Sequence, residues 1–218
     1  MIDVRLGFSK VDRAAYISHL DCNRLFQRAF KRSGLPVWYT QGFNPHVYLT
    51  FPLPLSLGIE SLCETVDFRL TEEIPIEEVT NRLNTVLPEG IRALWAAPPT
   101  YGAEQIASAF YEIRLYPKKD LPCALEAAQQ TLSAPQLLVD KKTKKGIKQI
   151  DLKQHLSNVS LSVEKDCVLL QAELPADGSL NINPALAAGV LNPPETGLFR
   201  FFTIRRTAIL TGDKSIFR

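Results

Sequence analysis

The stretch that decides the fold runs from Tyr16 to Gly58 and reads YISHLDCNRLFQRAFKRSGLPVWYTQGFNPHVYLTFPLPLSLG. Its first part predicts one helix, because Ser18 is a good N-cap, Gly34 suits the position after the last turn and Pro36 prevents continuation. The stretch also concentrates histidines, arginines, lysines and aromatic residues more densely than any other part of the chain. We therefore expect it to hold the functional site.

The helix is predicted to be amphipathic, with one apolar face and one cationic face. Residues at helical spacing share a face, and an apolar stripe packs on a core. We expect Cys22, Leu25, Phe26, Ala29 and Phe30 to be buried, and Arg24, Gln27, Arg28, Lys31 and Arg32 to face solvent.

The segments on either side predict strands and a second helix. Apolar residues alternate with polar ones in 4–8 and 65–70, and a helical stripe covers 75–87. Two more strands are expected at 47–51 and 91–96, which gives the order βαββαβ. That order is typical of the ferredoxin-like arrangement, an antiparallel sheet backed by two helices.

The second half of the chain predicts a similar order with extra strand material. Strands are expected at 111–115, 136–140, 147–152, 159–163, 168–174 and 199–210, and helices at 122–132 and from Asn183-Pro184. We therefore predict an α+β protein of two tandem ferredoxin-like units, the second elaborated. The predicted domains are 1–98 and 110–218, joined by a linker at 99–109.

Composition and charge narrow the class of protein. The chain has 218 residues, of which 45% are hydrophobic and 22% charged, and its net charge is +2. No apolar run fits a signal peptide or a membrane helix, so we expect a cytoplasmic protein without a membrane partner. Cations gather at 5–32 and 141–153 and acids at 60–89, which indicates charged faces rather than an even surface.

No metal or other cofactor is expected. The four cysteines Cys22, Cys63, Cys123 and Cys167 lie far apart and predict reduced thiols, not a zinc or redox motif. A metal site built from His19, Asp21 and His46 is disfavoured because their spacing matches no common ligand pattern.

Two histidines are candidate catalytic residues. His19 lies at the predicted helix N-terminus, where the helix dipole favours a neutral imidazole that can act as a general base. His46 follows Gly42 and Asn44 in a predicted turn, where glycine permits close approach of a ligand. The alternatives are that His19 only packs the first helical turn and that His46 belongs to an ordinary turn.

Cations and flat rings together predict a site for single-stranded RNA. Guanidinium and ammonium groups bind phosphates, and aromatic rings stack on bases, although a basic helix face can also be merely solvated. The candidate nucleic-acid-binding residues are Arg24, Arg28, Lys31, Arg32, Trp38, Tyr39, Phe43 and Asn44, together with Lys141, Lys142, Lys144 and Lys145 in a predicted hairpin tip.

Several short motifs in this stretch resemble those of a known family. They are the segments 16–21, 32–36, 42–46 and 57–61, together with Arg24 and Arg28-Ala29. The chain resembles the bacterial radical SAM-linked protein family, a domain of unknown function, most specifically over residues 3–70. The resemblance implies a radical SAM enzyme as partner, encoded nearby or fused in relatives. The cysteine triplet that holds the cluster of such enzymes is missing here, so this chain is expected to hold no cluster.

Three functions remain open from the sequence. The first is an accessory RNA-binding module that works with a radical SAM enzyme in tRNA or rRNA modification. The second is a metal-independent endoribonuclease that uses His19, with Arg24 or Lys31 stabilising the developing charge. The third is a protein-interaction domain that docks the radical SAM partner. Whether the protein is an enzyme is therefore undecided.

A geometric prediction accompanies these hypotheses. Residues 35–41 are long enough to run back along the helix, at up to about 3.6 Å per residue. We therefore expect Asn44 and His46 to meet His19 and Asp21 in one pocket at the helix N-terminus, where a phosphate or sulfate would bind. The alternative is that the loop turns outward.

Overall fold

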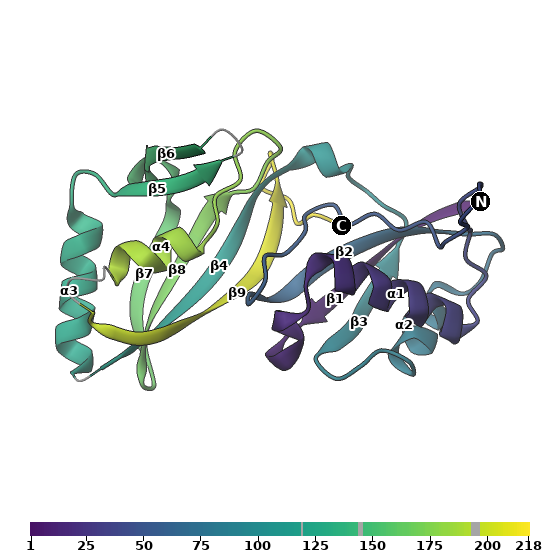
Figure 1. The fold of residues 1–218 in the computed structure, drawn as a ribbon, viewed down its shortest axis with the longest axis horizontal. Helices are drawn as coiled ribbons and strands as arrows, with labels where there is room; N and C mark the ends of the chain where they lie inside the picture. Colours follow the sequence, from purple (N-terminus) through teal and green to yellow (C-terminus); the bar gives the residue numbers. More distant parts are fainter. Residues whose placement is uncertain (119, 144–145, 193–196) are drawn as a thin grey trace. The chain divides into compact units, whose positions relative to one another are not determined.

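The computed structural model describes residues 1–118, 120–143, 146–192 and 197–218, and it shows an α+β fold with a mostly antiparallel sheet (Figure 1). The chain divides into two compact units. Unit 1 comprises residues 1–106 and 208–218, and unit 2 comprises residues 107–207. The predicted division at 99–109 stays a prediction. Among the described residues, no helix has both the length and the apolarity that crossing a membrane requires.

Unit 1 is built on a central strand. This strand, β1, pairs antiparallel with β2 on one side and β3 on the other. Figure 1 shows α1 and α2 on one face of these strands. The elements are β1 (Ile2–Lys10), η1 (Asp12–Tyr16), α1 (His19–Ser33), β2 (Glu60–Leu70), α2 (Ile76–Asn84), β3 (Ile91–Ala97) and η2 (Ala103–Gln105).

The core of unit 1 follows the predicted alternation. Val4, Leu6 and Phe8 on β1 are at most 1% exposed and face α1. The ring of Phe8 lies 4.7 Å from that of Phe26, measured between centroids. Four of the five predicted apolar positions of α1 are buried, and the fifth, Leu25, is half-buried. The face of α1 that carries the cations therefore points to solvent.

Both predicted ends of α1 are confirmed. Ser18 is the N-cap, and its hydroxyl oxygen accepts a hydrogen bond from the backbone N–H of Asp21. Gly34 follows the last turn with a φ of 65°, in the left-handed region that glycine adopts without a Cβ penalty. The local sequence alone thus sets where the helix begins and ends.

The predicted strand at 47–51 is wrong. This segment forms only isolated bridges, Tyr39 with Val47 and Thr50 with Asp67. The side chain of Gln27 on α1 explains the difference, because its amide bonds both the N–H and the C=O of Val47, at 2.9 and 2.7 Å. The backbone of Val47 is thereby paired with a helix rather than with a sheet.

Unit 2 contains a four-stranded sheet in the order β9-β4-β8-β7 and a separate two-stranded sheet, β5-β6. The second sheet is the predicted hairpin. The elements are β4 (Ile106–Pro117), α3 (Leu121–Ser133), β5 (Leu138–Thr143), β6 (Gly146–Asp151), η3 (Leu152–His155), β7 (Ser157–Glu164), β8 (Cys167–Pro175), α4 (Ala185–Leu191) and β9 (Phe199–Thr211). The last residues of β9, from Ala208, belong to unit 1.

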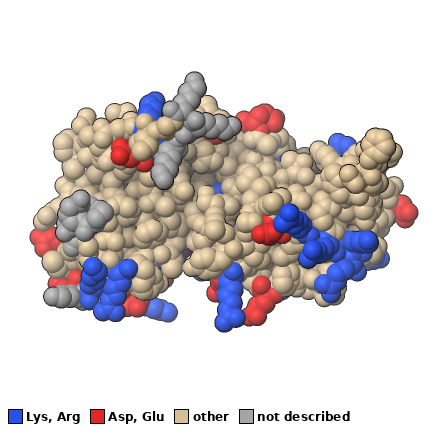
Figure 2. Space-filling model, viewed as in Figure 1, with Lys and Arg blue, Asp and Glu red and all other residues tan. Residues whose placement is uncertain are grey.

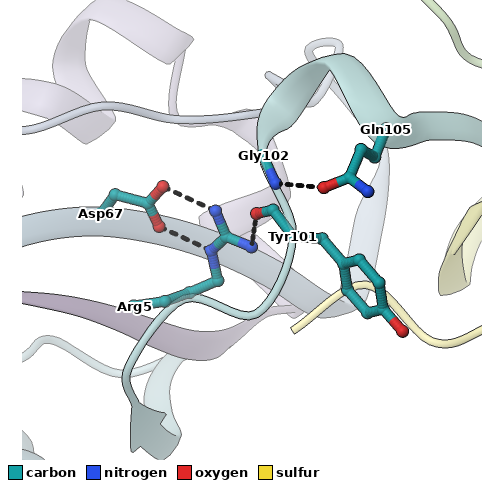
Figure 3. A network of polar contacts seen from close by, with 5 residues as sticks. All are labelled: Arg5, Asp67, Tyr101, Gly102 and Gln105. Atoms are coloured by element: carbon teal, nitrogen blue, oxygen red, sulfur yellow. Dashed lines mark hydrogen bonds and ion pairs between the residues drawn. The ribbon is translucent and has the colours of Figure 1, made fainter.

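A buried arginine fixes the segment after β3 within unit 1 (Figure 3). Arg5 is 1% exposed, and its Nε and Nη2 donate to the two carboxylate oxygens of Asp67 at 2.6 and 2.7 Å. Its Nη1 donates to the carbonyl of Tyr101 at 2.8 Å, and its guanidinium lies 4.1 Å from the ring centroid of Phe217. One side chain thus joins two strands, the segment before η2 and the C-terminal residues.

Candidate nucleic-acid interface

The cationic side of α1 lines a groove of about 580 Å³. Arg24, Arg28 and Arg32 follow one another at intervals of four residues, so their guanidinium groups lie about one helical turn apart on one side. The apolar lining consists of Ile17, Leu25, Ala29, Val86 and Pro88. The groove therefore has a cationic rim and an apolar floor.

The groove is positive despite one ion pair within it. Arg24 donates to Asp21 at 3.0 Å, but the two side chains are 62% and 58% exposed. A hydrogen bond from Ser18, followed by the one from Arg24, lowers the pKa of Asp21 below its ordinary value. Exposed pairs of this kind contribute little to stability, so Arg24 can exchange Asp21 for a phosphate.

The surface view agrees with this arrangement. Figure 2 shows Lys and Arg side chains gathered in a band over α1. Lys31, like Arg24, Arg28 and Arg32, is exposed, as predicted for that face of the helix. The cationic side chains extend along the whole helix, because Arg24 lies near the first turn and Lys31 and Arg32 lie in the last turn. The positive partial charge of the helix dipole is confined to the N-terminus, so it does not account for the positive charge along α1. The band is a property of the side chains.

The aromatic candidates that follow α1 differ in how exposed their rings are. Phe43 is fully exposed and Tyr39 is 40% exposed, so both rings are available for stacking. Trp38 is half-buried and packs against Tyr48, and the guanidinium of Arg69 lies 5.6 Å from its ring. The indole of Trp38 therefore serves the packing of this segment.

His46 and Asn44 do not join His19 in the described contacts. The Nδ1 atom of His46 lies 3.1 Å from Thr40 Oγ1 and 3.0 Å from the carbonyl oxygen of Asn44, within its own turn. Phe51 takes the place expected for His46, and its ring meets that of His19 edge-on at 5.2 Å. The turn lies level with Gln27, eight residues and about 12 Å along the helix from His19.

His19 borders a buried polar cluster that the sequence reasoning missed. Lys10, Cys22, Glu64 and His19 line a cavity of about 10 Å³, the size of one water molecule. Lys10 is 3% exposed and donates to the carbonyl of Ala15, and Glu64 is 4% exposed. Burial lowers the pKa of Lys10 and raises the pKa of Cys22 to about 11.

The signal for this cluster was present in the strand alternation. Lys10 has the same parity as Leu6 and Phe8, and Glu64 has the same parity as Val66 and Phe68. Residues two apart on a strand face the same side, so both charges belong to the buried series. Their cavity is too small for a substrate, and we assign the cluster to the packing of β1, β2 and α1.

The helical geometry separates the residues of the predicted nuclease. Arg24 follows His19 by five residues, which turns it by about 140° around the helix axis. Lys31 follows His19 by twelve residues, about 18 Å along the axis. His19 and Arg24 thus lie on different sides of α1, and Lys31 lies far along the axis from His19.

The lysine hairpin is partly described. Lys141 and Lys142 lie on β5, and Lys141 pairs with Lys148 of β6 across the hairpin. Lys144 and Lys145 lie outside the described residues. Across the described ranges, no group of three or more His, Cys, Asp or Glu side chains is placed to hold a metal ion.

Two solved structures show distant similarity to this chain. A chain in the crystal structure of a Cbf5-Nop10-Gar1 complex is 9% identical, with a TM-score of 0.46 over 93% of this chain. This chain covers 48% of that one, about half of its length. An unknown protein from Galdieria sulphuraria is 12% identical, with a TM-score of 0.27 over 94% of this chain and 98% of that chain. No curated protein matches the sequence.

The sequence does match one protein family. The match covers residues 4–184, which include α1, the arginine groove and most of unit 2. The family is described as "Uncharacterized protein conserved in bacteria (DUF2344)". This description agrees with a bacterial domain of unknown function, and the chain belongs to this family.

Proposed function

We propose that the protein is an accessory RNA-binding module that works with a radical SAM enzyme in tRNA or rRNA modification. The observation that carries the proposal is the groove beside α1, where three arginines at one-turn spacing border an apolar floor. Guanidinium groups bind phosphates in bidentate geometry, and an apolar floor accepts the face of a base or a ribose.

The segment after α1 supports the same proposal. Phe43 and Tyr39 present exposed rings on a turn that Gln27 holds against the helix. An exposed aromatic ring can stack on a base without first leaving a packed core. Lys31 lies one helical turn after Gln27, which holds the turn, and Arg28 lines the groove, so a strand that crosses α1 meets cations along its path.

The RNA test compares two pairs of arginines. We expect Arg24→Ala with Arg28→Ala to weaken binding of single-stranded RNA and to reduce the slope of log K against log salt by about 1.4, which is 0.7 for each lost phosphate contact. The matched control is Arg13→Ala with Arg92→Ala, which removes two exposed arginines outside the groove. The control should leave the slope unchanged. Salt-independent binding by the wild type, or equal loss in both pairs, would refute the proposal.

The radical SAM partner rests on the motif resemblance in 16–61. Its test is co-elution of this protein with the radical SAM enzyme from the same genome. We expect co-elution to persist after nuclease treatment if the two proteins touch directly. Separate elution in the presence and absence of RNA would remove the partner from the proposal.

One observation favours the interaction-domain alternative. Tyr16, Leu20 and Leu57 are 75%, 60% and 63% exposed, and they lie near the start of α1. Exposed apolar side chains that gather together are typical of protein contacts. The acidic segment 60–89 is less suited to docking, because Glu64 is buried and Asp67 is paired with Arg5. Nuclease-insensitive co-elution without any affinity for RNA would support this alternative over the first proposal.

We also propose that unit 2 is a ferredoxin-like fold with an inserted hairpin. In its order β9-β4-β8-β7, the last strand lies beside the first, and the two middle strands lie on the other side. Helices α3 and α4 connect them in the split βαβ manner. An experimental structure of unit 2 with another strand order would refute this assignment.

A further inference from the structure

Two aromatic rings of unit 2 form a stacked pair at the end of the sheet where β4 ends. Tyr116 on β4 and Phe201 on β9 lie 4.4 Å apart between ring centroids, with an angle of 19° between their planes. Phe201 is 53% exposed, so about half of its surface remains open to solvent. Such an exposed pair is not explained by packing of the core.

The pair lies on the face of the sheet opposite the helices. Along β4, Tyr111, Ile113 and Leu115 are at most 3% exposed and belong to the core, where α3 and α4 pack. Successive side chains of a strand point to opposite faces, so Tyr116 points away from that core. Phe201 stacks on Tyr116 and therefore shares the outer face.

Two cationic residues lie beside the ring pair in sequence. Lys118 and Arg200 are exposed, and each lies within two residues of one of the rings. Arg200 donates a hydrogen bond to the backbone carbonyl of Lys118 at 3.0 Å, which holds the two cationic residues together. The backbone N–H of Lys118 donates to the carbonyl of Leu198 at 2.9 Å and fixes the ends of β4 and β9 side by side.

Two acids of this face share one arginine. Arg114, on the same face of β4 as Tyr116, makes ion pairs with Glu112 and Glu164, each at 2.9 Å. The turn between β7 and β8 adds Lys165 and Asp166, which are of opposite charge. The charged residues nearest the two rings in sequence are Arg114, Lys118 and Arg200, and all three are cationic.

We propose that Tyr116 and Phe201 form a stacking platform for unpaired bases of RNA, with Lys118 binding the adjacent phosphate. This site lies in unit 2, apart from the arginine groove of unit 1, and it rests on the proposed RNA-binding function. Open sheet faces with central aromatic residues bind one base on each ring, and stacking accepts any base because each has a flat face. Because the two rings already stack on each other, the platform is ordered before a base arrives.

The test measures binding of a single-stranded oligouridine of about 12 nucleotides and of an RNA duplex without overhangs. We expect Phe201→Leu to weaken oligouridine binding roughly tenfold, equivalent to about 1.4 kcal/mol, and to leave duplex binding unchanged. Phe201→Tyr keeps a ring and should bind oligouridine like the wild type. The matched control is Phe202→Leu, which removes a ring at the next position of β9, on the opposite face of the strand.

The outcomes separate this inference from the proposed function. If wild-type protein binds no RNA, both fail. If it binds RNA and Arg24→Ala with Arg28→Ala weakens binding, but Phe201→Leu does not, only the platform is overturned. Equal losses in Phe201→Leu and Phe202→Leu would also overturn it, since the effect would not belong to the outer face. Loss of duplex binding in Phe201→Leu would likewise contradict stacking, because a duplex offers no unpaired base. Thermal unfolding of each variant shows whether the fold is kept.

Discussion

Two ion pairs across β1 and β2 provide a controlled test of what burial does to a charge. Arg5 opposes Asp67 and Asp3 opposes Arg69 in the same antiparallel register, two residues apart. Both pairs join an arginine to an aspartate at 2.6–2.7 Å. They differ in exposure: the side chains of Arg5 and Asp67 are 1% and 24% exposed, and those of Arg69 and Asp3 are 35% and 64% exposed.

The expected costs of breaking the two pairs differ accordingly. Asp67→Asn leaves the guanidinium of Arg5 buried without a counter-charge, which costs about 3–5 kcal/mol of unfolding free energy. Asp3→Asn breaks an exposed pair and should cost at most about 1 kcal/mol. The free energies of unfolding of the two variants should therefore differ by at least about 2 kcal/mol. At about 2–4 °C per kcal/mol for a chain of this size, it lowers the Tm of Asp67→Asn by at least about 4–8 °C relative to Asp3→Asn.

The assay is urea unfolding of both variants beside the wild type, followed by tryptophan fluorescence and circular dichroism. Equal midpoints for Asp67→Asn and Asp3→Asn would refute the reasoning, because the variants differ chiefly in the burial of the partner arginine. A loss below about 1 kcal/mol in Asp67→Asn would show that the carbonyl of Tyr101 and the ring of Phe217 suffice to hold Arg5.

Two further predictions concern the core of unit 1. A Cβ at Gly7 would lie 2.1 Å from the indole of Trp95, so Gly7→Ala should displace that ring. We expect it to lower the free energy of unfolding by about 1–3 kcal/mol and to change the tryptophan emission. Unchanged emission and an unchanged Tm would contradict this contact. The folded Cys22 thiol keeps its proton to about pH 11, above the ordinary value of 9.0. Raising the pH from 9 to 11 therefore favours the unfolded chain, and wild type should lose about 1.9 kcal/mol relative to Cys22→Ala between urea titrations at these two pH values. An unchanged difference between the two proteins would contradict this prediction.

Local chemistry was enough to predict α1 and its cationic face. Ser18 and Gly34 act within one helical turn of their positions, and the spacing of Phe26 and Phe30 depends only on the helical period. The same holds for Val4, Leu6 and Phe8, whose alternation places them on one face of β1 whatever lies beyond. Arg24 and Arg28 are exposed for the complementary reason, since the opposite side of the helix is buried. These features depend on neighbours in sequence.

The tertiary structure decided which distant residues meet. No sequence pattern near Val47 shows that Gln27 takes both of its backbone groups, and that contact turns an expected strand into isolated bridges. For the same reason Phe51, rather than His46, reaches His19. The burial of Lys10 and Glu64 was not predicted, although strand parity indicates it, and their shared cavity depends on the packing of α1 across β1 and β2.

In unit 2, the pairing of β4 with β9 likewise brings together residues that are distant in sequence. Tyr116 and Phe201 are 85 positions apart, and each alone reads as an ordinary strand aromatic. Their stacking depends on the register between the first and last strands of the sheet, which no local period encodes. Likewise, Phe217 meets Arg5 because the end of β9 belongs to unit 1. Sequence determines which faces are apolar or charged, and long-range register determines which side chains share a site.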